Sequence, residues 1–357
     1  MGRINKDTTE ALKWLRYVLN PNTEMPEVRD WSALYAFAER QKITGICSPL
    51  QFSIKIEQTI LFQWLGIEQQ IKKRCIVLNK RIKELCQLLE NSGFQCCIMK
   101  GQGNAEMYPE PSLRMSGDID VWVDADEETI QEFIWRKYPN AQKLFKHIDF
   151  PVFGDVPVDV HVTPLKLYCP KYHKKLQRWI EDNKQKQFGH RIHLTGIDKE
   201  VCVPTVKFNA IYQLGHMLIH LLYEGVGLRH MVDYFYVLKG LNLTEVEREE
   251  IIGTLRDLGM MRFAKAVMWI ENTVLGLPLA YCIVNPDEKR GQQLLADVLD
   301  SGNFGKYSQR YKGRTGFYWR GIIDARRLFS LMSFAPCEVT FCLLRKVKTA
   351  VKHTCKT

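Results

Sequence analysis

Two aspartates, Asp118 and Asp120, stand one residue apart directly before the apolar run Val121-Trp122-Val123. In a strand, both carboxylates would project from one face, while Ile119 and Val121 would point to the other. Two carboxylates on one face repel each other unless a cation or a proton lies between them. Mg²⁺ suits such a position because it prefers oxygen ligands. The pattern predicts either a metal-binding strand or, more simply, a pair of solvated loop residues.

The residues upstream of the acidic pair combine a short apolar segment with glycines and a lysine. Cys96 to Met99 is an apolar run that ends in Lys100-Gly101, with Gly103 close behind. This order predicts a strand that enters a tight turn. Glycines let a phosphate approach backbone N–H groups closely, and the ammonium of Lys100 adds a positive charge. We therefore expect a phosphate-binding turn beside the acidic pair.

A third carboxylate lies on a second predicted strand, downstream of the first. Residues from Val156 to Val162 alternate, so that the valines share one face and Asp159 and His161 share the other. Carboxylates supplied by two strands are what a two-metal phosphoryl-transfer site needs.

The order of these motifs carries a resemblance to a known family. The matching residues are Met99-Lys100-Gly101, Tyr108-Pro109, Leu113-Arg114, Asp118-Ile119-Asp120 and Val158-Asp159-Val160-His161. In these positions the chain resembles the uncharacterised bacterial nucleotidyltransferase family of the DNA polymerase β superfold. The resemblance covers most of the chain and is densest from Leu78 to Pro164. In the helical part it extends to His216, His220, Gly227, Arg229 and Asp233.

The resemblance implies transfer of a nucleotide from an NTP, such as ATP, to an acceptor hydroxyl, with Mg²⁺ or Mn²⁺ as cofactor and pyrophosphate as product. The metal-binding and catalytic residues would be Asp118, Asp120 and Asp159. The nucleotide-binding residues would be Lys100, Gly101, Gly103 and Arg114. A candidate substrate cleft would contain His161, His216, His220, Arg229 and Asp233. Among possible acceptors, a small molecule is favoured over protein or RNA.

Several of these residues also have simpler interpretations. Arg114 could form an ion pair with the acidic pair instead of clamping a phosphate. His216 and His220 have the i, i+4 spacing of zinc ligands, but histidines satisfied within a core are the simpler account. Arg229 and Asp233 have the spacing of an i, i+4 ion pair and could merely tie two helices together.

Two other functions would use the same carboxylates. A phosphatase or nuclease, that is a metal-dependent phosphohydrolase, would employ water as the acceptor. A catalytically silent nucleotide-binding or antitoxin-like regulatory protein would retain the fold without turnover. The intact Asp118, Asp120 and Asp159 argue against the silent protein.

Composition indicates a globular protein, since 46% of the 357 residues are hydrophobic and 25% are charged. The formal net charge of +10 favours a polyanionic partner or a triphosphate. The 11 cysteines show no CxxC pair, so no zinc or disulfide framework is readable and a reduced cytosol is the simplest account. The start lacks an apolar signal core, and no apolar run reaches about 18 residues. We expect a cytoplasmic protein without a membrane span.

The predicted fold class is α+β, with a small mixed sheet between N-terminal and C-terminal helical regions. We expect an N-terminal helical region at 1–72, a nucleotidyltransferase α/β catalytic domain at 73–165 and a mostly helical C-terminal domain at 166–357. A long helix is predicted from Ile67 to Ser92, with an apolar stripe from Ile71 to Leu89 and basic residues on a solvated face.

Local patterns place the remaining elements of the chain. Strands are expected over 95–99, 118–123, 144–150 and 156–162, and helices over 126–137, 206–223, 244–258, 263–275 and after 336. Residues 168–188 are expected to form a helix or a mobile cover. Residues 303–319 are rich in Gly, Tyr and Arg, which predicts an irregular segment.

Overall fold

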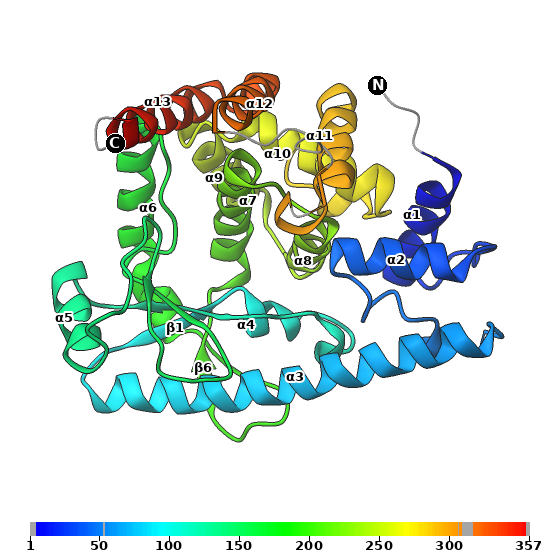
Figure 1. Ribbon diagram of the computed structural model, residues 1–357, viewed down its shortest axis with the longest axis horizontal. Helices are drawn as coiled ribbons and strands as arrows, with labels where there is room; N and C mark the ends of the chain where they lie inside the picture. The colour runs from blue at the N-terminus through cyan, green and yellow to red at the C-terminus, as the bar shows by residue number, and fades with distance from the viewer. Residues whose placement is uncertain (1–4, 53, 306, 309–316, 355–357) are drawn as a thin grey trace. The chain divides into compact units, whose positions relative to one another are not determined.

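The computed structural model describes residues 5–52, 54–305, 307–308 and 317–354 (Figure 1). The chain divides into two compact units. The first is Met1–Leu165 with Trp179–Asn209, and the second is Lys166–Arg178 with Ala210–Thr357. Helices α6 (Pro170–Gly189) and α7 (Val206–Tyr223) contribute residues to both units.

The first unit begins with helices α1 (Lys6–Leu19) and α2 (Trp31–Gln41). Each helix starts at a capping side chain, since Asn5 accepts a hydrogen bond from the Thr8 N–H and Asp30 accepts one from the Ala33 N–H. The indole of Trp14 is fully buried and donates a hydrogen bond of 2.9 Å to the carbonyl of Cys47. The tryptophan thus belongs to the core.

Helix α3 (Gln58–Asn91) is the longest element, with 34 residues, and is drawn in cyan in Figure 1. The predicted apolar stripe is buried along its length, from Ile71 through Leu78 to Leu89. The predicted start at Ile67 is wrong, because the helix begins nine residues earlier, at Gln58. Its first turns bury Ile60 and Trp64, so packing extends the helix beyond the part with clear periodicity.

The basic residues of α3 do more than form a solvated face. Arg74 donates hydrogen bonds to the carbonyl oxygens of Asp155 (2.7 Å) and Gly117 (2.6 Å). The guanidinium of Arg81 forms a bidentate ion pair with the Asp155 carboxylate. Arg74 therefore fixes the backbone directly before Asp118.

The sheet of the first unit has the strand order β1-β2-β4-β3. Its strands are β1 (Cys96–Met99), β2 (Ile119–Val123), β3 (Ile148–Asp149) and β4 (Val158–His161). β1 runs antiparallel to β2, β2 runs parallel to β4, and β3 runs antiparallel to β4. The short helix α4 (Gly101–Ala105) follows β1, and α5 (Glu127–Lys137) follows β2. The expected α+β class with a small mixed sheet is confirmed.

Alternation along the strands gives the sheet two different faces. Ile119, Val121, Val158 and Val160 enter a core that also contains apolar residues of α3 and α5. The residues between them, such as Asp120 and Asp159, face the other way. On that second face Trp122 packs against the rings of Phe188, at 4.9 Å between centroids, and Phe208, at 5.9 Å.

The edge strand β3 is much shorter than the strand expected over 144–150. Leu144 and Phe145 are exposed and lie outside it, and β3 consists of Ile148 and Asp149, which pair with β4. A separate hairpin joins β5 (Arg191–His193) to β6 (Glu200–Cys202).

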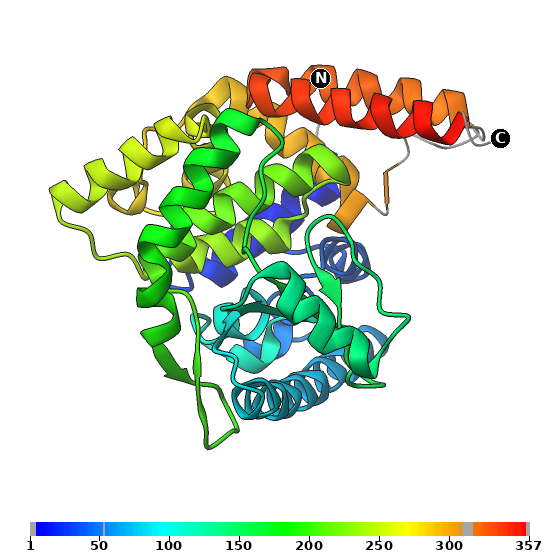
Figure 2. The same cartoon turned by 90° about the vertical axis from the view of Figure 1, so that its left-hand side faces the viewer.

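The second unit is helical, as expected. After α7 it contains α8 (Leu228–Lys239), α9 (Glu245–Asp257), α10 (Met261–Trp269) with a π-helical end (Ile270–Val274), α11 (Glu288–Ser301), α12 (Phe317–Ser330) and α13 (Pro336–Thr354). Helices α12 and α13, coloured orange and red, run side by side (Figure 2). The irregular segment predicted over 303–319 ends earlier, because α12 begins at Phe317; residues 306 and 309–316 lie outside the described part of the chain. None of the helices that the structure describes is long and apolar enough to cross a membrane.

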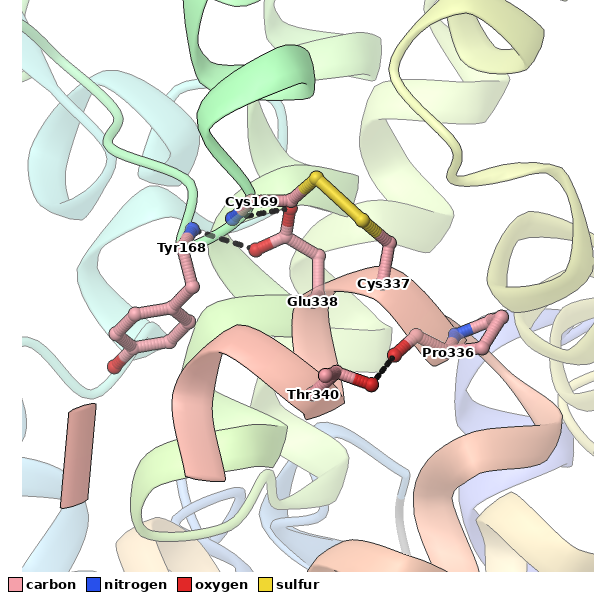
Figure 3. The surroundings of a disulfide bond; sticks show 6 residues. All are labelled: Tyr168, Cys169, Pro336, Cys337, Glu338 and Thr340. Atoms are coloured by element: carbon pink, nitrogen blue, oxygen red, sulfur yellow. Dashed lines mark hydrogen bonds between the residues drawn. A yellow bond between two sulfur atoms is a disulfide. The ribbon is translucent and has the colours of Figure 1, made fainter. Parts of the chain in front are cut away.

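A disulfide between Cys169 and Cys337 cross-links the second unit (Figure 3). Cys169 directly precedes α6, and Cys337 lies in the first turn of α13. The neighbouring Glu338 is buried and accepts hydrogen bonds from the backbone N–H groups of Tyr168 (2.6 Å) and Cys169 (3.1 Å). The expectation of reduced cysteines is wrong for this pair. The two cysteines are 168 residues apart in the sequence, so no local spacing of cysteines could have predicted the bond.

Replacing Cys337 with Ala is expected to lower the free energy of unfolding of the second unit by about 2–5 kcal/mol, because the bond restricts the unfolded chain. Denaturant unfolding of the oxidised protein measures this change. A dithiol reductant should bring the wild-type midpoint to that of the variant. The matched control is Cys342→Ala, which removes a free, buried thiol of the same helix and should leave the midpoint sensitive to the reductant. A wild-type midpoint that the reductant does not move would contradict the prediction.

Candidate active site

The structure places two of the three candidate carboxylates opposite each other on one face of the sheet, and the charge of the third, Asp118, acts on Asp159. Asp120 on β2 is the direct cross-strand partner of Asp159 on β4. Side chains at paired positions of neighbouring strands project from the same face. Asp118 lies two residues before Asp120, directly before β2, and is exposed. The guanidinium of Arg74, which donates a hydrogen bond to the carbonyl oxygen of Gly117, holds the backbone at this entry to the strand.

Asp120 is buried between two nitrogen groups. Its Oδ1 atom accepts a hydrogen bond from the Lys100 ammonium at 2.8 Å and lies 2.9 Å from Nε2 of His161. Burial alone would raise the pKa of Asp120, but Lys100 and His161 together outweigh burial and hold that pKa well below its usual range. Asp120 is therefore ionised, with Lys100 as its nearest cation.

Asp159 has the opposite electrostatic character. Burial raises its pKa most, and the negative charges of Asp120 and Asp118 raise it further, while Lys100 opposes them; the resulting pKa is about 7. Its side chain is 23% exposed, so solvent reaches the carboxyl group. Near neutral pH this residue can therefore exchange a proton or bind a cation.

The turn between β1 and α4 places Lys100 in an unusual backbone conformation. Lys100 has φ 51° and ψ −139°, a region that residues with a side chain rarely adopt. Gly101 follows with φ 39°. Lys100, whose ammonium contacts Asp120, therefore has a strained backbone. Strain of this kind is typical of functional sites.

Lys100→Gly should be more stable than Lys100→Ala by about 1–2 kcal/mol, since only glycine adopts this conformation without strain. Both variants remove the ammonium next to Asp120, so the comparison isolates the backbone. Denaturant unfolding of the two proteins measures the difference. Equal stabilities would show that the backbone at Lys100 carries no strain.

Two other predicted phosphate-binding residues, Gly103 and Arg114, are more buried than Lys100. Gly103 is buried within α4, and a Cβ atom there would lie 3.1 Å from Cγ1 of Val203, so the glycine allows close packing. The neighbouring Gln102 is buried and donates a hydrogen bond of 2.6 Å to Asn79 of α3. Arg114 is buried and donates a hydrogen bond to the hydroxyl of Ser116, in the segment that leads into the acidic pair.

His147 is a polar residue of this face that the sequence analysis missed. Its Nε2 atom lies 3.2 Å from Asp149 Oδ1 and 3.5 Å from Asp159 Oδ2. Its ring centroid is 5.6 Å from that of His161. Burial and the neighbouring His161 lower the pKa of His147. The alternation in Lys146-His147-Ile148-Asp149, with Ile148 in the core, is the signal that could have placed this histidine on the polar face of the sheet.

Four of the predicted cleft residues lie in the second unit, on α7 and α8. Nε2 of His220 lies 2.9 Å from Nε2 of His216, and Nδ1 of His220 lies 2.9 Å from Oε1 of Glu224. Arg229 stands over the ring of Phe304, with its guanidinium carbon 5.5 Å from the centroid. Asp233 is buried on α8. Their part in a substrate cleft stays a prediction.

A family model matches most of this chain. The model of a family described as uncharacterised nucleotidyltransferase matches residues 27–276. Among solved structures, an antigenic nucleotidyltransferase-like protein from Paracoccidioides brasiliensis is similar at 14% identity and a TM-score of 0.31, with 58% of this chain and 96% of that chain covered. No curated protein matches significantly. Since the matched range spans most of the sequence and contains every candidate residue named above, the chain belongs to the uncharacterised nucleotidyltransferase family.

Proposed function

We propose that this chain transfers a nucleoside monophosphate from an NTP to an acceptor hydroxyl, with release of pyrophosphate and dependence on Mg²⁺ or Mn²⁺. The cross-strand pairing of Asp120 with Asp159 carries the proposal. Burial and the charges of Asp120 and Asp118 raise the pKa of Asp159 to about 7. Carboxylates that repel one another in this way form a site whose repulsion a divalent cation relieves.

The donor set fits the cofactor. Asp118, Asp120 and Asp159 offer carboxylate oxygens, the ligand type that Mg²⁺ and Mn²⁺ prefer. A divalent ion held there would supply positive charge that stabilises the attacking and leaving oxygens of an in-line displacement.

The side chains of this site then perform the remaining steps. Asp159 accepts the proton of the acceptor hydroxyl, and the acceptor oxygen forms a bond to the α-phosphorus. The bond from this phosphorus to the oxygen bridging to the β-phosphate breaks, and pyrophosphate leaves. Lys100, already 2.8 Å from Asp120, and Arg114 balance the negative charge of the phosphates. Gly101, at the turn itself, allows a phosphate to approach the backbone closely.

The finer parts of the proposal follow from the sequence. We assign the transfer chemistry to residues 73–165, flanked by helical regions at 1–72 and 166–357. ATP is the first nucleotide to test, and the net charge of +10 supports binding of a triphosphate. A small molecule is the favoured acceptor, and the cytoplasm the favoured compartment.

Calorimetry with each NTP tests the first step of the proposal. We expect binding of an NTP by the full chain in Mg²⁺, with an affinity that falls at least about tenfold when Mg²⁺ is removed by a chelator. Asp118→Asn should lose most of this metal dependence. The matched control is Asp198→Asn, because Asp198 is an exposed aspartate of the same unit that pairs with Lys83. Absence of NTP binding, or binding that ignores both Mg²⁺ and Asp118, would contradict the proposal.

A further inference from the structure

Three side chains on the polar face of the sheet form a cluster with mixed nitrogen and oxygen donors. His147, Asp159 and His161 each offer a ligand atom, and these atoms all lie within 4.8 Å of one another. Asp159 and His161 are two residues apart on β4 and therefore share a face. His147 precedes β3, whose Asp149 pairs with Asp159 across the sheet edge.

The backbone beneath the cluster is firmly placed. Ile148, Val158 and Val160, which alternate with the cluster residues, are buried in the core on the opposite face. Asp159 and His161 occupy strand positions, which hold side chains more accurately than loops do, and His147 directly precedes a strand. The cluster also has an open side, since the side chains of His147 and Asp159 are 18% and 23% exposed, while that of His161 is 7% exposed.

Each imidazole also has a carboxylate neighbour outside the cluster. Nε2 of His147 lies 3.2 Å from Asp149 Oδ1, and Nε2 of His161 lies 2.9 Å from Asp120 Oδ1. Carboxylates next to ligand imidazoles commonly orient their rings. When a cation binds, Nε2 of each histidine would bond to the metal in place of its contact with the carboxylate. Asp149 and Asp120 would remain next to the two rings.

The donor types decide which cation suits the cluster. Mg²⁺ prefers all-oxygen sites, whereas imidazole nitrogen favours borderline transition-metal ions. Two imidazoles and one carboxylate, with a side open to water, are a ligand set that Zn²⁺ uses in catalytic sites. We propose that His147, Asp159 and His161 bind a transition-metal ion, with Zn²⁺ as the preferred ion, in a position distinct from the all-carboxylate position at Asp118 and Asp120. The inference is connected to the proposed function only because Asp159 belongs to both sites. Binding of Zn²⁺ does not require that the chain transfer a nucleotide.

Titration of the chelator-treated full chain with Zn²⁺ tests this inference. We expect one site whose affinity is little changed by an excess of Mg²⁺. His147→Gln should weaken Zn²⁺ binding by at least about a hundredfold, since loss of a ligand exceeds the effect of losing an orienting neighbour. The matched control is His193→Gln, because His193 is an exposed histidine of the hairpin strand β5 and its loss should leave binding unchanged. Asp159→Asn, which preserves side-chain size, is a second variant expected to lose the site.

Co²⁺ serves as a spectroscopic probe of the same position. Its visible bands should appear with the wild-type chain, should lack the intense charge-transfer absorption of a thiolate ligand, and should vanish in His147→Gln. Equal Zn²⁺ affinity in wild type and His147→Gln, a thiolate absorption, or displacement by equimolar Mg²⁺ would each overturn the inference. Asp118→Asn separates the two proposals, because it should lose nucleotidyl transfer and retain Zn²⁺. Failure of transfer in the wild type would leave the Zn²⁺ result standing on its own.

Discussion

Replacing Asp118 with Asn is expected to lower the rate of nucleotidyl transfer by about a thousandfold or more, because a metal–phosphate interaction supplies several kcal/mol of transition-state stabilisation. Asp118 is exposed and precedes β2, so the substitution should leave the fold intact. The rate of pyrophosphate release from the NTP, in the presence of an acceptor-containing cell extract, measures the effect.

The control for this experiment is Asp198→Asn, which makes the same chemical change at an aspartate that pairs with Lys83. It should retain the wild-type rate. Thermal unfolding of both variants checks that the fold is unchanged. If Asp118→Asn releases pyrophosphate as fast as the control, Asp118 does not hold the metal.

Asp159→Asn is expected to lower the transfer rate by about 10²–10⁴-fold, the usual contribution of a general base. Because Asp118 and Asp120 remain, binding of the NTP should change far less than the rate. Single-turnover rates and calorimetry separate the two quantities. A parallel loss of rate and NTP affinity would show that Asp159 acts in binding and not in proton transfer.

The pH profile gives the same residue a second test. Burial and the charges of Asp120 and Asp118 raise the pKa of Asp159 to about 7. Below that pH the carboxyl group of the metal-free chain is protonated, so the binding of Mg²⁺ should weaken as the solution becomes more acidic. Calorimetry with Mg²⁺ measures this change, and an affinity that stays constant from about pH 8 to about pH 6 would contradict Asp159 as a ligand that must lose its proton to bind the ion.

The alternation of residues along the strands predicted much of this site. Because neighbouring residues of a strand face opposite ways, the valines around Asp159 and the Ile119 between the two aspartates were expected on the face opposite the carboxylates. They lie on that face and are buried in the core. The same reasoning placed Asp120 and Asp159 on polar faces. It could not establish that they pair directly, since register depends on how the two strands meet.

Features that depend on contacts between residues far apart in the sequence were not predicted. His147 lies outside its short edge strand, and only the pairing of that strand with β4 shows that the histidine faces Asp159. The positive φ of Lys100 has no signal in the sequence, because residues with a side chain rarely adopt it. Cys169 and Cys337 are separated by 168 residues and meet only because α13 packs near the start of α6 in the second unit.

The fate of a label at the α-phosphate of the NTP tests the central claim most directly. The full chain is incubated with the labelled NTP, Mg²⁺ and a cell extract, and mass spectrometry identifies the labelled products. We predict that the label becomes attached to an acceptor, that an equal amount of pyrophosphate appears, and that Asp118→Asn yields neither. Label found entirely in free nucleoside monophosphate would identify a phosphohydrolase, and an NTP that binds but is never consumed would identify a silent binding protein; either result would contradict nucleotidyl transfer.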